Sequence, residues 1–208
     1  MKHFLVSQNR IGAKQIGSAM LLALVLSTVG CAAKRVVLVP AANATLAPQP
    51  NSAQGSSQGV SIQLRANAWD DDPKTLGQDV VPVEIAIQND SERPLAIRYE
   101  DFALIGANNH RYSDIPPYQI AGDSYKHLQP YWAHSDAYHS AVRLPTKAML
   151  QDAIPEGVIA DHGRTTGFLY FTKPMGQSQQ LAFQAALVDM RTGQRFGGIV
   201  VPLAMKVF

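Results

Sequence analysis

Apolar and polar side chains alternate with a period of two along several short segments after Val60, which is the pattern of β-strands with one buried side. The segments with this pattern or with a short apolar run are 60–68, 80–88, 95–99, 102–105, 166–172, 181–190 and 195–205. A short loop with Gly193 joins the last two segments, as expected for a hairpin. The pattern therefore predicts an antiparallel sandwich of about seven to eight strands.

Three details refine this prediction. The segment 166–172 has large apolar side chains on both of its sides, which indicates a strand that is covered on both faces. Pro82 lacks an amide proton, so its strand is expected to have a free side at that point. One short helix is predicted at 145–154, because Pro145 suits a first helical position and the Pro-Glu-Gly at 155–157 ends the helix.

A family resemblance supports an all-β domain. The segment VPVEIAIQNDSERPLAIRYEDFALIG, 81–106, resembles the opening of bacterial telokin-like, Ig-like envelope domains of unknown function, and IPEGVIADHGRTTGFLYFTKP, 154–174, resembles their later Gly-aliphatic-aromatic strand. The resemblance covers about 60–205 and implies an Ig-like β-sandwich. It carries no catalytic residues, so none are expected from it.

The N-terminus has the pattern of a secretory signal peptide. Residues 1–15 contain three Lys or Arg and no acid, and an apolar run of 14 residues follows at 16–29, which is too short to span a bilayer. The end of this run, Thr28-Val29-Gly30-Cys31, resembles a bacterial lipobox, and Cys31 is the single cysteine of the chain. We therefore predict a lipoprotein signal peptide at 1–30.

The lipobox resemblance implies a maturation route and a location. In that family a diacylglycerol is attached to the cysteine thiol, the chain is cut between the residues at Gly30 and Cys31, and the new amino group is acylated. Palmitate-type chains on Cys31 would then hold the protein on a membrane without a further cofactor. The next residue is Ala32 and not Asp, which implies the outer membrane, and we expect the domain to face the periplasm.

The composition changes between the cysteine and the predicted strands. Residues 40–59 are rich in Ala, Pro, Ser, Gln, Asn and Gly and contain no charge, which is typical of a linker. We therefore expect three parts: the signal peptide at 1–30, an acylated cysteine with a flexible linker at 31–59, and the folded domain at 60–208.

Charge and motifs exclude several functions. The formal net charge of +2 becomes −1 when residues 1–30 are removed, because 15 Lys and Arg then stand against 16 Asp and Glu, so a nucleic-acid partner is not expected. The sequence has no Gly-x-Ser-x-Gly elbow, phosphate loop, HExxH or CxxC. We therefore expect a protein that is not an enzyme.

A long segment at 106–143 interrupts the strand pattern and is the place where function is expected. Because Tyr and Trp are common in binding hot spots, the segment is interpreted first as a binding surface for another envelope protein or a glycan. The candidate binding residues are Tyr118, Tyr125, Tyr131, Trp132 and Tyr138.

Two other interpretations of this segment stay open. His127, His134 and His139 could bind Cu or Zn, with Asp123 or Asp136 completing the site, although their spacing fits neither a helix face nor a strand. Alternatively, the aromatic side chains simply cover one open face or end of the sandwich.

Overall fold

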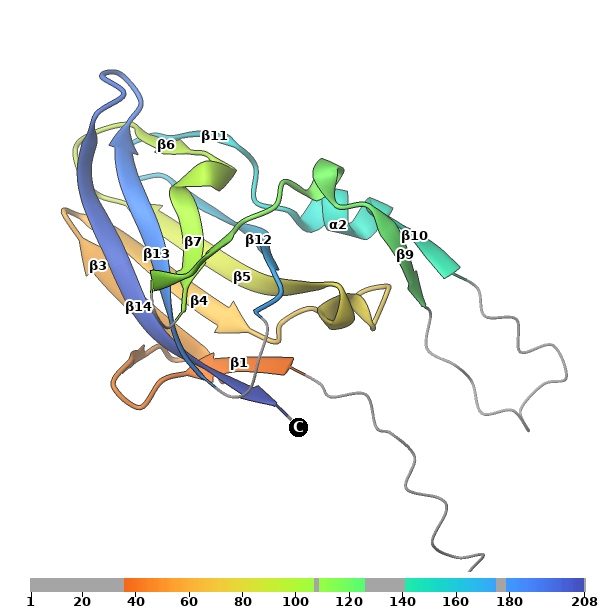
Figure 1. Ribbon diagram of the computed structural model, residues 1–208. Coiled ribbons are helices and arrows are strands. Elements are labelled where there is room, and N and C mark those ends of the chain that lie inside the picture. Colours follow the sequence, from red (N-terminus) through yellow and green to blue (C-terminus); the bar gives the residue numbers. More distant parts are fainter. Residues whose placement is uncertain (1–35, 107–108, 126–140, 175–178, 208) are drawn as a thin grey trace, which may run out of the picture. The chain divides into compact units, whose positions relative to one another are not determined.

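Two antiparallel β-sheets pack face to face in the computed structural model, which describes residues 36–106, 109–125, 141–174 and 179–207. The seven-stranded sheet lies in front of the five-stranded sheet in Figure 1. The seven-stranded sheet comprises β1 (Val36–Pro40), β6 (Leu95–Ile97), β7 (Phe102–Ile105), β8 (Arg111–Ser113), β11 (Gly157–Ile159), β13 (Gln179–Asp189) and β14 (Arg195–Val207). The five-stranded sheet comprises β12 (Arg164–Thr172), β5 (Val80–Asn89), β4 (Val60–Ala66), β3 (Ser52–Ser57) and β2 (Thr45–Leu46), in that spatial order.

The remaining elements are short. A two-stranded ribbon pairs β9 (Gly122–Tyr125) with β10 (Ala141–Leu144), and one α-helix, α2 (Lys147–Asp152), follows it. Three 3₁₀ turns lie in the described residues: η1 (Leu76–Gln78), η2 (Tyr99–Asp101) and η4 (Pro117–Gln119). The antiparallel sandwich with one short helix is confirmed, but fourteen strands lie in the described residues, where about seven to eight were predicted.

The main core lies between the two sheets. In β4, the four residues predicted to face inward, Val60, Ile62, Leu64 and Ala66, are 0–5% exposed. They meet side chains such as Phe183 of β13 and other inward residues of β14. Truncating a buried Phe to Ala costs about 3–5 kcal/mol of unfolding free energy, so this alternation accounts for much of the stability.

The prediction of a flexible linker at 31–59 is wrong from Val36 onward. This stretch contains β1, which pairs with β14, and β2 and β3, which extend the five-stranded sheet. The folded domain therefore begins before residue 60. Residues 31–35 lie outside the described residues.

Strand β3 has the composition of a linker, although it pairs with β4 as part of the sandwich. Ala53 is buried, and Gly55 faces inward so closely that an added Cβ would lie 2.9 Å from a methyl carbon of Ile199. The residues Gln58 and Gly59 both have positive φ, which is the geometry of a tight two-residue hairpin turn between β3 and β4. Small residues that are typical of linkers are thus required here by close packing and by the turn.

Other sequence predictions are confirmed. The pairing of β5 with β4 ends at Val83, so β5 has only β12 as a partner at Pro82. The hairpin loop between β13 and β14 closes through the Gly193 amide, which donates to the carbonyl of Asp189 at 2.8 Å, and Gly193 has a φ of 69°. The helix begins at Lys147 instead of Pro145, because the Thr146 hydroxyl caps it by accepting from the Met149 amide at 3.2 Å.

A buried asparagine joins the two segments that carry the family resemblance. Asn89, at the end of β5, is 0% exposed. Its amide nitrogen donates to the carbonyls of Arg93, Ile159 and Ala160 at 2.7, 3.0 and 3.1 Å, and its oxygen accepts from Ser91. All polar atoms of the side chain are therefore used in fixing the turn at 89–93 to the turn at 159–163.

Candidate functional site

The predicted insertion at 106–143 is attached to the sandwich along much of its described length. It leaves β7 and returns at once as β8, which pairs with β7 so that Ile105 lies opposite Arg111. It then passes the free edge of β12, forms η4, and continues into the β9–β10 ribbon. Figure 1 shows the ribbon next to α2.

A second apolar core anchors the ribbon. It lies on the side of β12 that faces away from the main core, and Ile120 before β9 and Leu144 at the end of β10 both belong to it. Its buried members are Leu76, Val80, Ile120, Leu144, Met149 and Tyr170, with Trp69, Ile115, Ala153 and Phe168 packed against them. The base of the ribbon, where β9 begins and β10 ends, is therefore fixed by burial.

Polar and aromatic contacts give the second core a defined geometry. The buried hydroxyl of Tyr170 donates to the carbonyl of Met149 at 3.1 Å, and burial raises the pKa of this hydroxyl. The indole of Trp69 lies edge-on to Phe168 with ring centroids 5.2 Å apart and donates to the carbonyl of Pro73 at 3.2 Å. The prediction that 166–172 is covered on both faces is therefore confirmed, since Phe168 and Tyr170 face this core.

The free edge of β12 is closed by segments from the insertion and from the chain after α2. The Ile115 amide donates to the carbonyl of Tyr170 at 2.7 Å, and the Ile154 amide donates to the carbonyl of Phe168 at 3.0 Å. The second contact requires Gly167, because a Cβ there would lie 2.5 Å from the nitrogen of Ile154.

At this edge, the side chain of Asp114 accepts a hydrogen bond from β12 that a backbone carbonyl accepts in a regular strand pair. Its Oδ1 accepts from the Tyr170 amide at 2.8 Å, and the residue is only 7% exposed. Within the described part of the chain, its Oδ2 has no hydrogen-bond partner. Burial raises the pKa of this carboxyl to about 8, although two backbone amides oppose the shift. Sequence patterns gave no signal for this residue, because an Asp after a short strand is normally exposed.

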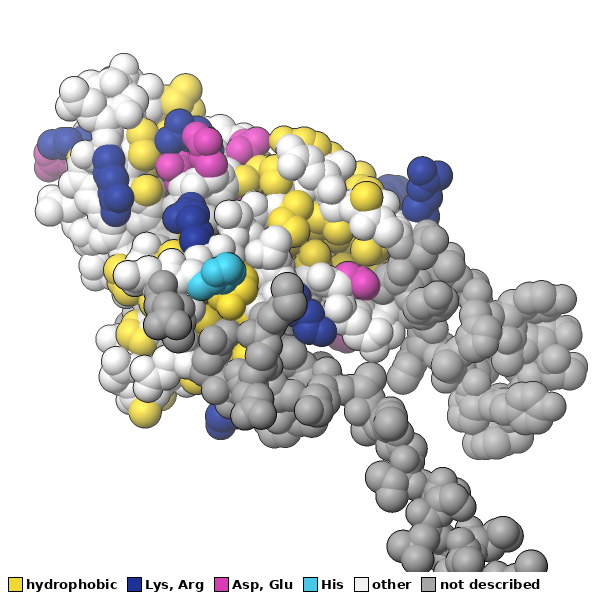
Figure 2. Space-filling view, in the orientation of Figure 1, with side chains coloured by type: hydrophobic (Ala, Val, Ile, Leu, Met, Phe, Trp, Pro, Cys, Tyr) yellow, Lys and Arg dark blue, Asp and Glu magenta, His cyan; other side chains and the backbone are white. Residues whose placement is uncertain are grey.

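Apolar side chains near the base of the ribbon remain exposed. Tyr118 on η4 is 62% exposed and Leu150 on α2 is 49% exposed, and these two elements pack against each other. Figure 2 shows hydrophobic side chains gathered over this region. The described part of the insertion therefore presents an apolar surface at the base of the ribbon.

The structure places only part of the predicted site. Tyr118 is exposed as a binding residue requires, and the backbone of Tyr125 pairs with Ala141 at the end of the ribbon. The other predicted residues lie outside the described residues, and the predictions made for them stay predictions. They are Gly30, Cys31, His127, Tyr131, Trp132, His134, Asp136, Tyr138 and His139.

The described residues contain neither a cluster of metal ligands nor a membrane-spanning helix. No group of three or more His, Cys, Asp or Glu in that part of the chain could hold a metal ion. The three candidate histidines are not among those residues, so this result does not test them. No described helix is long and apolar enough to cross a membrane.

A second concave feature lies on the outer face of the five-stranded sheet. It is a depression of about 260 Å³, and the small side chain of Ala86 is part of its lining. Its polar lining comes from Gln54, Ser61, Gln63, Gln88 and Arg164. The pairing of β5 with β4 and β12 places these residues in two adjacent rows across the sheet.

Comparisons with known proteins give little further information. No protein-family model matches the chain, and no curated protein matches it. A solved structure from Bacillus subtilis, described as a "putative lipoprotein", is similar over 74% of this chain with 13% identity and a TM-score of 0.37. This chain covers 38% of that protein's length. The Ig-like family resemblance therefore stays a prediction.

Proposed function

We propose that this protein is a bacterial envelope lipoprotein that is anchored by acyl chains on Cys31 after cleavage behind Gly30. The support is the pattern at 28–31, which combines a short apolar run with the single cysteine of the chain. In this proposal the mature protein stays on the outer membrane and faces the periplasm.

The proposed task of the folded domain is non-catalytic binding of another envelope component, a protein or a glycan. The observation that carries this proposal is the anchoring of the base of the β9–β10 ribbon in the second core, while Tyr118 and Leu150 nearby remain exposed. A rigid base lowers the entropy that a bound segment loses on association. Exposed Tyr and Leu side chains supply apolar contact area.

The anchor is tested by the mass of the N-terminal peptide of the mature protein. We expect a peptide that begins at Cys31 and carries three acyl chains, and a Cys31→Ser variant that remains an uncleaved precursor. A normally cleaved Cys31→Ser variant, or an unmodified thiol in the wild-type protein, would show that the lipoprotein proposal is wrong.

The binding function is tested by photo-crosslinking in cells. A crosslinking amino acid at Tyr118, Tyr131 or Trp132 is expected to give one discrete adduct, which mass spectrometry identifies. The matched control is Gln63, which lies on the outer face of the five-stranded sheet. The same adducts from Gln63, or none from the three aromatic positions, would contradict a binding role for the aromatic segment at 106–143.

A further inference from the structure

The outer face of the seven-stranded sheet departs from the usual alternation. Directly paired residues in an antiparallel sheet lie on the same side. One outward row across three strands is Pro202, Ala182 and Ile105, and the next row is Val200, Gln184 and Ala103. On β1, Val39 pairs with Ala204 and continues this surface to the edge of the sheet.

An antiparallel sheet that faces water on one side normally carries polar residues there. Here Val200 is 58% exposed, and Val39, Ile105 and Pro202 are half-buried. Their inward-facing neighbours Ile199, Val201 and Leu203 are at most 2% exposed, so β14 is apolar on both sides. Such a strand is expected when something covers its second face.

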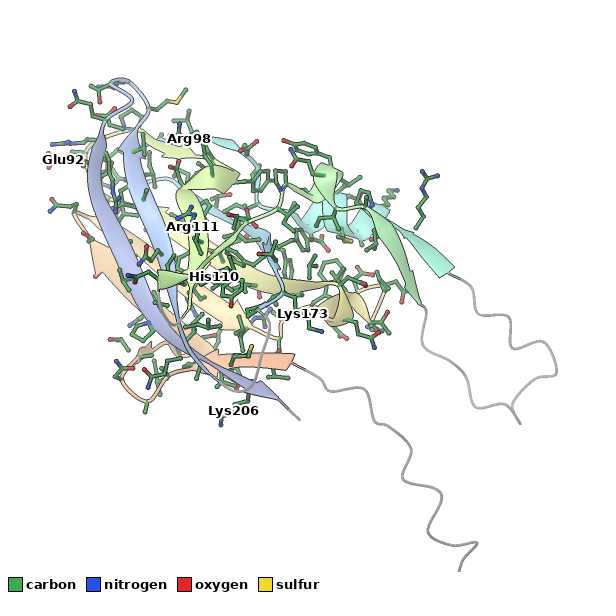
Figure 3. The ribbon with its side chains drawn as sticks, viewed as in Figure 1. Glu92, Arg98, His110, Arg111, Lys173 and Lys206 are labelled. Carbon is green, nitrogen blue, oxygen red and sulfur yellow. The ribbon has the colours of Figure 1, made fainter. Side chains whose placement is uncertain are left out.

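The charges at the paired outward strand positions have one sign, whereas Glu100 and Asp101 on η2, directly before β7, form ion pairs with Arg98. Lys206 and Arg111 occupy outward positions opposite Val37 and Ile105. Arg195 donates from Nε to the carbonyl of Gly197 at 2.9 Å and lies against Gly198, which also faces outward. Figure 3 shows Arg111 at β7 and Lys206 near the ends of β1 and β14. No Asp or Glu occurs at the outward positions that pair among β1, β14, β13, β7 and β8.

The start of β1 limits the distance between this face and the proposed anchor at Cys31. Strand β1 is an edge strand of the sheet, and it starts at Val36, opposite Val207. Cys31 precedes Val36 by five residues. Because a fully extended chain spans at most about 3.6 Å per residue, the connection from Cys31 to Val36 can span at most about 18 Å.

We propose that the outer face of β1, β14, β13 and β7 lies on the surface of an anionic lipid bilayer. The inference rests on the proposed acylation of Cys31, which would keep β1 beside the membrane. Val200 and its neighbours then contact the interface, and Arg111, Arg195 and Lys206 approach lipid phosphates. The opposite side of the sandwich faces away from the bilayer.

The test uses the mature, acylated protein in vesicles of phosphatidylethanolamine and phosphatidylglycerol. A single cysteine replaces Val200 or, as the matched control, Gln63, and each carries a fluorescent bimane. Acylation blocks Cys31, so only the introduced cysteine reacts. We expect a nitroxide attached to lipid to quench the Val200 probe several-fold more than the Gln63 probe, and aqueous iodide to give the reverse order.

A charge variant tests the electrostatic part. Lys206→Glu is expected to lose most of the lipid quenching at Val200, whereas Lys147→Glu, with the same change in net charge on exposed α2, is expected to retain it. If both variants retain the lipid quenching of the Val200 probe equally, Lys206 has no role in membrane contact. Vesicles of phosphatidylcholine alone should give weaker lipid quenching than the anionic vesicles.

The other outcomes are distinguishable. If the protein isolated from cells carries a free Cys31 thiol and does not stay on vesicles, the lipoprotein proposal itself fails. If Cys31 is acylated but iodide quenches both probes equally, only the orientation of the face is wrong. If the Val200 probe is shielded from iodide without being quenched by lipid nitroxide, another protein or a second copy covers the face, and the lipid proposal is overturned.

Discussion

The two outer faces of the sandwich differ in the kind of side chain that they expose to solvent. On the five-stranded sheet, β3, β4 and β5 present amide, hydroxyl and charged side chains, including the Arg65–Glu84 ion pair. The outer face of the same sheet is apolar at Phe168 and Tyr170 of β12, and there the second core covers it. The seven-stranded sheet leaves Val200 exposed among other apolar positions. Apolar outward residues thus mark a face with a covering partner, and here the described chain supplies that partner for one sheet.

The largest expected effect comes from removing part of the polar face. Deletion of 44–57 takes away β2 and β3, and with them the pairing partner of β4 and the contact of Gly55 with Ile199 and Val201. We expect the protein to lose its cooperative thermal transition, measured by circular dichroism. An unchanged melting temperature would restore the linker interpretation of this segment.

A finer version of this test compares two neighbours on β3. Gly55→Val places a side chain where a Cβ already lies 2.9 Å from a methyl carbon of Ile199, whereas Ser56→Val points outward. Overpacking of this kind costs about 1–3 kcal/mol of unfolding free energy, and an outward substitution costs within about 0.5 kcal/mol. Similar losses in denaturant unfolding for both variants would show that the sheet face has been assigned wrongly.

The next comparison sets a covered apolar residue against an uncovered one. Tyr170→Ala opens a cavity in the second core and should lower the unfolding free energy by about 3–5 kcal/mol. Val200→Ala on the seven-stranded sheet should change it by less than about 0.5 kcal/mol. Tyr170→Phe, which removes only the hydrogen bond to Met149, should fall between them at about 1–2 kcal/mol. Equal effects of the two alanine variants would show that the described second core does not stabilise the fold.

The strands of the main core were predictable because their periodicity is strong. In β4 and β5 every second residue is aliphatic, and alternation alone assigns the buried side. The prediction for residues 36–57 was wrong because the residue types there are determined by contacts with residues that are distant in sequence. Gly55 is required by Ile199, about 140 residues later, and no local pattern reports such a contact. Composition therefore gave the wrong answer for β3.

The candidate site was predictable only in outline. The long aromatic segment was visible in the sequence, and the exposure of Tyr118 agrees with its predicted role. The second core that anchors this segment could not be predicted from the sequence, because it combines residues from three distant segments around Tyr170. Asp114 was also missed, since burial of an acid depends on how the insertion crosses β12 and not on its neighbours in sequence.

Asp114 should make stability depend on pH. Because burial raises its pKa to about 8, the folded state keeps a proton that the unfolded state releases above about pH 4. The unfolding free energy should therefore fall as the pH rises from about 4 to about 8, by at most about 1.4 kcal/mol per pH unit. Urea unfolding between pH 5 and pH 8 measures this slope.

The control for this slope is a substitution that keeps the Oδ1 acceptor. Asp114→Asn can still accept from the Tyr170 amide but cannot titrate, so its stability should vary less between pH 5 and pH 8 than that of the wild type. Asp152→Asn, at an exposed position on α2, should leave the wild-type slope intact. If Asp114→Asn and the wild type show the same slope, the carboxyl is already ionised in the folded protein.

The smallest expected effect lies at the turn beside the polar face. His162 is within 3.1 Å of Asp90 Oδ1 and 3.4 Å of Asp161 Oδ2, and these carboxylates raise the pKa of its imidazole, with the Asp90 contact as the larger cause. A raised pKa in the folded state stabilises the protein below the unfolded value of about 6.5, and this contribution is lost as the pH rises through the folded value. Since the side chain is 80% exposed, solvent and salt screen most of it.

His162→Asn is the suitable variant because His162 has a φ of 60° and Asn tolerates this left-handed conformation. The variant should lose a small gain in melting temperature that the wild type shows on acidification from pH 8 to pH 6, and high salt should reduce that gain in the wild type as well. Asp114 also contributes in this range, so the difference between the two proteins at each pH is the informative quantity. A difference that is independent of both pH and salt would mean that the His162–Asp90 contact adds nothing measurable to the stability of the turn.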